Sequence, residues 1–235
     1  MQEMKQYAII VAGGKGLRMG GDVPKQFQLL AGRPVLMHTL EQFRAYDADL
    51  DIILVLPPAQ QDYWRQLCQQ HNFSVEHRIA DGGQTRFHSV KNGLALIPDT
   101  ADGLVGVHDG VRPLVTPTLI SRCFTSAAQA KAVVPGVPVA DSLRHARHGA
   151  LSREDVYRVQ TPQTFTVSLL KEAYRQPYRT DFTDDASVVE AAGHPITLIP
   201  GTPENIKLTT PFDLTVAEAV LSSRHTQLST LNYKL

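Results

Sequence analysis

The chain has 235 residues, of which 43% are hydrophobic and 20% are charged, and its 23 basic and 23 acidic residues cancel. This size suits one large α/β domain or two small ones, and the zero formal charge argues against a general nucleic-acid or membrane binder. Cys68 and Cys123 are too few for a disulfide framework, and the apolar run after residues 1–6 is too short for a signal peptide or a membrane span. We therefore expect a cytoplasmic protein with buried, unreactive thiols.

Short apolar runs alternate with amphipathic stretches in the first part of the chain, which is the pattern of βα units around a mainly parallel sheet. The predicted strands cover residues 7–11, 52–56, 74–78, 104–108 and 132–137. Four helices are predicted in this part of the chain. The first begins at Pro34, the second covers residues 60–70, the third follows the turn at residues 81–86, and the fourth covers residues 119–130. In the helix at residues 60–70, we expect Tyr63, Trp64 and Leu67 on the inner side.

The alternation stops at residues 140–160, which are polar and irregular. This stretch predicts an excursion from the sheet, a hairpin arm over about residues 139–160. Beyond it, the pattern predicts helices at residues 167–174 and 184–192, a strand at residues 195–199, and a last helix at residues 212–221. We expect Thr210 to cap this last helix and the polar tail after Ser222 to fray.

The first predicted strand leads into a glycine-rich loop, residues 12–25, that also carries basic side chains. Glycines let backbone N–H groups approach an anion closely, and Arg18 and Lys25 suit the loop to a polyphosphate. The spacing excludes a P-loop, because Gly16 stands where Ser or Thr would follow the lysine, and it excludes a dinucleotide fingerprint, because Met19 replaces the third glycine. A plain flexible turn would explain the glycines but not the basic residues.

Other polar residues follow other predicted strands, at the sheet edge where ligands of parallel sheets bind. Asp109 is either an Asx turn or a carboxylate for a hydroxyl group or a metal, and Lys207 either snorkels to solvent or reaches the site. Asp184 and Asp185 are more simply a helix cap than a metal pair. The nine histidines show no zinc-ligand spacing. A basic pocket without a paired nucleophile favours direct phosphoryl or nucleotidyl transfer.

Seven segments together resemble the 2-C-methyl-D-erythritol 4-phosphate cytidylyltransferases of the non-mevalonate isoprenoid pathway. They are residues 12–19, 24–27, 81–83, 108–113, 161–165, 183–186 and 205–207. The resemblance covers about residues 6–222. The combination of the seven segments is specific to this family, whereas no single segment is. It implies a Rossmann-like α/β fold, a single nucleotidyltransferase domain over residues 1–235, and a homodimer held through the arm. It also implies CTP as co-substrate, Mg²⁺ as cofactor, and a polyol phosphate that attacks the α-phosphate and expels pyrophosphate.

The resemblance further implies roles for the residues at matching positions. The nucleotide would be bound by Ala12, Gly13, Gly14, Gly16, Gly83, Gln84 and Ser89. The catalytic residues would be Arg18, Lys25, Lys207 and Arg153, the last reaching across from the partner subunit's arm. The sugar phosphate would be held by Asp109, Arg112, Ser142 and Thr161, with Asp109 also the candidate metal ligand.

Gln84 stands where the family commonly has an acidic residue. The contact with the ribose or base that the resemblance implies for Gln84 is therefore the weakest of these assignments. Three alternatives stay open at this point. A ribitol 5-phosphate cytidylyltransferase would share the CTP loops, and a sugar-nucleotide pyrophosphorylase would use UTP or GTP. A non-catalytic binding module of the same fold would not need to retain Arg18, Lys25 and Lys207 together.

Overall fold

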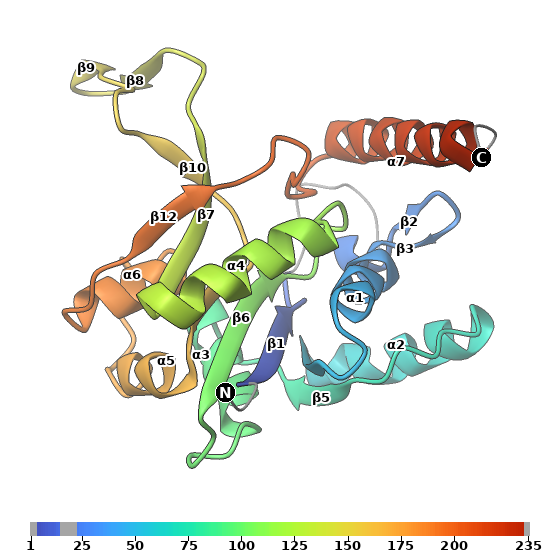
Figure 1. The fold of residues 1–235 in the computed structure, drawn as a ribbon, viewed down its shortest axis with the longest axis horizontal. Helices are drawn as coiled ribbons and strands as arrows, with labels where there is room; N and C mark the ends of the chain where they lie inside the picture. Colours follow the sequence, from blue (N-terminus) through green and yellow to red (C-terminus); the bar gives the residue numbers. More distant parts are fainter. Residues whose placement is uncertain (1–3, 15–22, 233–235) are drawn as a thin grey trace.

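A mixed β-sheet forms the centre of the fold (Figure 1). The computed structural model describes residues 4–14 and 23–232. Within these residues the sheet has eight strands in the order β10-β7-β11-β6-β1-β4-β5, with β12 paired to β7. The strands are β1 (Lys5–Val11), β4 (Asp51–Leu56), β5 (Arg78–Asp81), β6 (Gly103–Asp109), β7 (Ala132–Pro138), β10 (Tyr157–Val159), β11 (Gln163–Thr166) and β12 (Thr197–Pro200). Strands β5, β4, β1 and β6 are parallel, whereas β11 runs antiparallel between β6 and β7.

Helices cover both faces of this sheet. One face packs against α1 (Val35–Tyr46), α2 (Pro58–Gln70) and α4 (Pro117–Ala130), and the other against α3 (Arg86–Ala95), α5 (Val167–Ala173) and α6 (Asp185–Ala191). Successive residues of β1 alternate between the two cores, with Ala8 and Ile10 in the first and Tyr7 and Ile9 in the second. This period of two explains why the strand sequence is an unbroken apolar run: both of its faces are buried.

A third, smaller cluster attaches the end of the chain to the sheet edge. It joins α7 (Pro211–Asn232) to the hairpin of β2 (Leu29–Leu30) and β3 (Arg33–Pro34) and to the segment that follows β6. Leu208 is fully buried in this cluster, and its backbone N–H donates to the carbonyl of Val111 at 2.9 Å. The neighbouring Lys207 is thereby placed beside the carboxyl end of β6.

The predicted arm is observed as a hairpin that projects from the sheet (Figure 1, upper left). Its strands β8 (Leu143–His145) and β9 (Gly149–Leu151) pair antiparallel, and the chain returns through β10, which pairs with β7 in the main sheet. The sequence-based α/β fold with a protruding arm is therefore confirmed. None of the helices in the described part of the chain has the length and apolarity needed to cross a membrane.

Four details differ from the sequence-based expectations. The strand expected at residues 74–78 lies at Arg78–Asp81, because its register is set by pairing with β4. Strand β11 was not expected. Its four residues include three polar ones, so the sequence lacks the apolar run that marks the other buried strands. Helix α7 continues to Asn232 instead of ending near residue 221. Tyr63 is 41% exposed, while Trp64 is fully buried, because adjacent helical positions point about 100° apart.

The unequal burial of these two neighbours gives a test of the core. Trp64→Ala should lower the free energy of unfolding by about 3–5 kcal/mol, because it empties a site surrounded by Phe27, Phe73 and His77. Tyr63→Ala should cost about 1 kcal/mol, since it removes mainly one edge contact with Phe27. Urea unfolding followed by circular dichroism measures both, and equal losses would contradict this assignment of the inner face of α2.

Candidate active site

A cavity of about 200 Å³ opens over the carboxyl ends of β1, β5 and β6, where the sequence predicted a ligand site. Five stretches of the chain meet there. The residues that line the cavity are Val11, Ala12, Gly13, Gly14, Lys25, Gln26, Gly83, Gln84, Thr85, Arg86, Ser89, Asp109, Val111 and Lys207. Nine of the residues singled out from the sequence are among them. Gly16 and Arg18 lie outside the described residues.

The start of the first loop is fixed by backbone and side-chain hydrogen bonds. The N–H of Ala12 donates to the carbonyl of Val55 at 3.0 Å, and the amide of the buried Gln26 donates to the carbonyl of Ala12 at 2.7 Å. A Cβ atom on Gly14 would lie 3.2 Å from Cε of Lys25, so the glycine allows the lysine to lie close against this loop. The described start of the loop, residues 12–14, is therefore held in place by contacts within the protein.

The second loop depends on glycine for a steric reason. A Cβ atom on Gly83 would lie 2.4 Å from Cβ of His88, a distance no side chain can tolerate. The N–H of Gly83 donates to Oγ of Ser89 at 3.0 Å, and that hydroxyl donates to the carbonyl of Thr85 at 3.0 Å. Thr85 also caps α3 by accepting from the N–H of His88. The Ser89 hydroxyl thus holds the loop backbone at Gly83 and Thr85, while the side chain of Gln84 is exposed.

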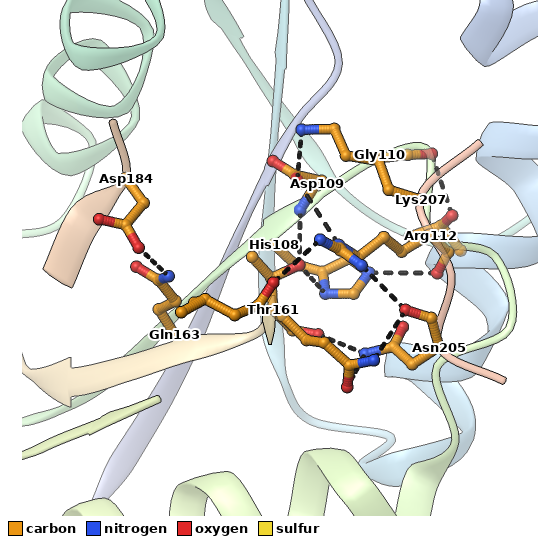
Figure 2. Close-up of polar contacts among 12 residues, drawn as sticks. His108, Asp109, Gly110, Arg112, Thr161, Gln163, Asp184, Asn205 and Lys207 are labelled. Atoms are coloured by element: carbon orange, nitrogen blue, oxygen red, sulfur yellow. Dashed lines mark hydrogen bonds and ion pairs between the residues drawn. The ribbon is translucent and has the colours of Figure 1, made fainter. Parts of the chain in front are cut away.

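Asp109 ends β6 and is surrounded by positive charge (Figure 2). Its carboxylate lies 2.8 Å from Nζ of Lys207, 3.4 Å from Nε of Arg86 and 3.6 Å from Nε of Arg112. Burial alone would raise the pKa of Asp109, but the charges of Arg86, Lys207 and Arg112 outweigh it and hold the pKa well below its ordinary value. Asp109 is therefore an ionised acceptor under all physiological conditions.

Arg86 is a site residue that the sequence analysis missed. Its guanidinium connects Asp109 to the fully buried Asp185, whose Oδ2 lies 2.6 Å away, and the hydroxyl of Tyr174 donates to the other oxygen of Asp185 at 2.6 Å. Burial would lower the pKa of Arg86, but the charge of Asp185 raises it well above its ordinary value. The available signal was its position at the end of the predicted turn, residues 81–86, where a helix begins.

The neighbouring Asp184 is the helix cap that the sequence predicted. Its carboxylate accepts from the N–H of Ser187 at 2.9 Å, and the Ser187 hydroxyl accepts from the Asp184 N–H, which completes a capping box. Asp185 does not share this role, because its side chain turns inward to Arg86.

Arg112 and Thr161 lie behind the cavity and contact Asp109 from there. Nη1 of Arg112 donates to the carbonyl of Asn205 at 2.8 Å. Oγ1 of Thr161 accepts from the backbone N–H of Asp109 at 3.1 Å. Both residues therefore support the end of β6, and neither lines the cavity in this structure.

Ser142 and Arg153 are not brought to the cavity of their own chain. Both are exposed on the arm, which projects away from the ends of β1 and β6 (Figure 1). The Arg153 guanidinium donates to the carbonyl of Ala140, so its contact is within the arm itself.

The described residues contain no group of three or more His, Cys, Asp or Glu side chains that could hold a metal ion by themselves. Among the described lining residues, Asp109 is the carboxylate that faces the cavity. A divalent cation here would need most of its ligands from a bound phosphate chain and water, which is how Mg²⁺ is commonly held in nucleotide sites.

A Rossmann-like sheet with a glycine-containing loop and several cations over its strand ends is the arrangement expected of a nucleotidyltransferase. Residues 6–223 match the family model of 2-C-methyl-D-erythritol 4-phosphate cytidylyltransferase. The chain belongs to this family.

Individual relatives agree with this assignment. An enzyme of Bacteroides thetaiotaomicron with the family's name is 63% identical over 221 residues, which is 93% of this chain and 100% of the relative. The solved structure of 4-diphosphocytidyl-2C-methyl-D-erythritol synthase from Anaerococcus prevotii matches with a TM-score of 0.78 and 28% identity, over 93% of this chain and 96% of that one. The structure of 2-C-methyl-D-erythritol 4-phosphate cytidylyltransferase from Thermus thermophilus matches with a TM-score of 0.73 and 32% identity, over 93% and 98%.

The two adjacent aspartates provide a matched test of the buried ion pair. Asp185→Asn should lower the free energy of unfolding by about 3 kcal/mol or more, because it leaves the charge of Arg86 poorly compensated in a buried site. Asp184→Asn should cost about 1 kcal/mol, since asparagine caps helices nearly as well as aspartate. Urea unfolding at neutral pH measures both variants, and similar losses would count against the Arg86–Asp185 pair as the stabilising contact.

Proposed function

We propose that the chain transfers a cytidylyl group from CTP to 2-C-methyl-D-erythritol 4-phosphate in the cavity over β1, β5 and β6. One observation supports this location above the others: Lys25 and the described start of the first loop line the same cavity as the Asp109–Lys207 pair. The family assignment supplies the reaction. In this proposal, the triphosphate and the acceptor phosphate meet in this cavity between the cations that line it.

The transfer itself needs positioning and positive charge rather than a nucleophile from the protein. A phosphate oxygen of the acceptor attacks the α-phosphorus of CTP, the bond from that phosphorus to the bridging oxygen breaks, and pyrophosphate leaves with the electron pair. Lys25 and Arg18 would stabilise the negative charge that spreads over the oxygens as this occurs. Lys207, 2.8 Å from Asp109, would orient the attacking phosphate.

The two loops divide the nucleotide between them in this proposal. Ala12, Gly13, Gly14 and Gly16 would bind the phosphates through backbone N–H groups. Gly83, Gln84 and Ser89 would bind the base and the ribose. The support is that all three residues line the cavity.

Asp109 and Arg112 would hold the acceptor. Asp109 is an ionised carboxylate at the cavity wall and is suited to accept hydrogen bonds from the hydroxyl groups of a polyol. Arg112 keeps that carboxylate in place at 3.6 Å and would add positive charge for the acceptor's phosphate.

Mg²⁺ would enter with the triphosphate. Asp109 is the described cavity carboxylate able to approach it, with phosphate oxygens and water as the other ligands. When bound, the ion supplies charge neutralisation to the phosphate chain.

A homodimer built through the arm would complete the site. The arm and the strands beside it expose apolar side chains, with Leu151 49%, Tyr157 40%, Val159 41% and Leu198 49% exposed. Such a surface is suited to a second copy of the same chain. The arm's Ser142 and Arg153 would then contribute to the partner's cavity, since they are remote from their own.

A cytoplasmic location agrees with the state of the two cysteines. Both are free thiols, and burial raises the pKa of Cys68 to about 11 and that of Cys123 to about 12, so neither forms thiolate readily.

A substrate panel tests the function directly. Release of pyrophosphate is measured for CTP, UTP and GTP, each with 2-C-methyl-D-erythritol 4-phosphate or ribitol 5-phosphate, with and without Mg²⁺. We expect kcat/KM for CTP with the methylerythritol phosphate to exceed every other pair by about 100-fold or more and to require Mg²⁺. A preference for ribitol phosphate would change the acceptor, equal use of UTP would indicate a sugar-nucleotide pyrophosphorylase, and no release from any pair would indicate a binding module.

Subunit mixing tests the proposed dimer. Lys25→Ala and Arg153→Ala should each lower kcat by about 100- to 1000-fold, because each removes a charge that acts on the transition state. If Arg153 acts in the partner's site, an equal mixture of the two variants should recover about a quarter of the wild-type activity, since one site of each mixed dimer is intact. Subunit exchange is confirmed by differently tagged chains. No recovery after confirmed exchange would place both residues in the same subunit's site.

A further inference from the structure

Gln26 is a fully buried amide beside the cavity, and the proposed reaction gives it no role. It lies in the short 3₁₀ turn η1 (Lys25–Phe27), directly after Lys25. This turn and the start of the first loop line the same cavity, and the Gln26 side chain reaches back 14 residues to Ala12. It is therefore placed to connect the turn that carries the lysine to the loop that would bind the phosphates.

Both hydrogens of the Gln26 amide are used inside the protein. Nε2 donates to the carbonyl of Ala12 at 2.7 Å and to Oε1 of Gln60 at 2.7 Å. Because a backbone carbonyl can only accept, the nitrogen must lie on this side of the amide and the oxygen on the other. That oxygen, Oε1 of Gln26, is buried and has no hydrogen-bond partner in the described part of the chain. Leaving it unpaired costs free energy, so the two bonds of Nε2 decide how the amide is oriented.

The bond to Ala12 determines the direction of the next peptide N–H. The peptide between Ala12 and Gly13 is planar and trans, so the Gly13 N–H points opposite to the carbonyl that Gln26 holds. Glycine has no Cβ to restrict its backbone, so this peptide would be free to rotate without the bond. Gly13 lines the cavity, and its N–H has no hydrogen-bond partner among the described residues. It is therefore a donor of fixed direction that a phosphate oxygen can use.

Helix α2 holds the same turn from the other side. Gln60, whose side chain accepts the second hydrogen of Gln26, lies in the first turn of α2. Phe27 is 2% exposed, and its ring centroid lies 5.3 Å from that of Tyr63 and 6.2 Å from that of Trp64 on this helix. The turn η1 is thus fixed between α2 and the first loop.

The position of Lys25 follows from these contacts, because Lys25 is the first residue of η1. A Cβ atom on Gly14 would lie 3.2 Å from Cε of Lys25, so the lysine side chain runs close along the loop. A shift of the turn would therefore move the lysine relative to Gly13 and Gly14, and with them the cation and the backbone donors would lose their common geometry.

We propose that Gln26 is a positioning residue for the nucleotide half of the site, and that Gln60 acts through it. The Gln26 amide sets the direction of the Gly13 N–H and the place of Lys25. Both of its hydrogens are committed to the protein and its oxygen is buried, so it acts through these neighbours and not on the substrate itself. The acceptor half is held by other contacts, those of Asp109 with Lys207 and other cations, so loss of Gln26 should affect the two substrates unequally.

Matched methionine variants test this proposal, which rests on the proposed function. Gln26→Met keeps the length of the side chain and removes the amide. Gln28→Met makes the same exchange two residues further on, where the glutamine side chain has no hydrogen bond to the described residues. We expect Gln26→Met to raise the Kd for CTP, measured by calorimetry with Mg²⁺, by about 10-fold and to lower kcat by about 10- to 100-fold, because small displacements of positioned groups have effects of this size. Gln28→Met should stay within about twofold of wild type in both.

The acceptor provides the readout that separates positioning from general damage. In Gln26→Met, the KM for 2-C-methyl-D-erythritol 4-phosphate at saturating CTP should stay within about twofold of wild type, whereas a generally loosened site would raise it together with the Kd for CTP. Circular dichroism checks folding. If Gln26→Met does not fold, Gln26→Asn takes its place, because an amide one methylene shorter does not reach both acceptors and should show the same unequal loss.

Gln60 tests the direction of the effect. Gln60→Met leaves the bond from Gln26 to Ala12 in place, so it should cause a smaller loss of the same kind. The double variant Q26M/Q60M should be no worse than Gln26→Met, because Gln60 acts only through Gln26.

Three results would overturn the proposal: a folded Gln26 variant that binds and uses CTP as wild type does, a KM for the acceptor that rises in parallel with the Kd for CTP, or losses in the double variant that multiply. Each is distinct from failure of the proposed function, which would show as a wild-type chain that releases no pyrophosphate from CTP and the methylerythritol phosphate.

Discussion

A carboxylate withdrawn from water at the end of β6 must be matched by positive charge, and the arrangement around Asp109 follows from this requirement. Removing a charge from water costs several kcal/mol unless nearby opposite charges and hydrogen bonds compensate. Lys207, Arg86 and Arg112 supply that compensation from three separate parts of the chain. The outcome is a site with three fixed cations around one fixed anion. The cations suit the site to phosphate groups, and the carboxylate suits it to hydroxyl groups.

The rest of the fold can be understood as the means of bringing those cations together. Parallel pairing of β1, β4, β5 and β6 places their carboxyl ends at one edge, so the loops after them share a cavity. Arg86 arrives on the first turn of α3 and is held by Asp185 from α6. Lys207 arrives because Leu208 is buried in the cluster that attaches α7 to the sheet. Stability and function therefore share the same contacts at this edge.

Much of this could be predicted from local sequence signals. The unbroken apolar runs of β1, β4 and β6 and the cap formed by Asp184 depend on residues close together in the chain, so spacing alone identifies them. Strand β5 and the inserted β11 could not be placed well, because their register is set by neighbours distant in the chain. Tyr63 illustrates the same limit within one helix, since a difference of one position decides between core and solvent.

The sequence by itself determined the fold class, the strand ends that carry polar residues, and the family. These depend on periodicity and on motifs in a fixed order, both of which are properties of the chain. Only the tertiary structure decided that Asp185 is the buried partner of Arg86, that Gln26 directs its amide to Ala12, and that Ser142 and Arg153 are remote from the cavity of their own chain. The reason is physical: the cost of a buried charge or amide is met by whichever groups the packing brings close, and that closeness is not encoded by separation along the sequence.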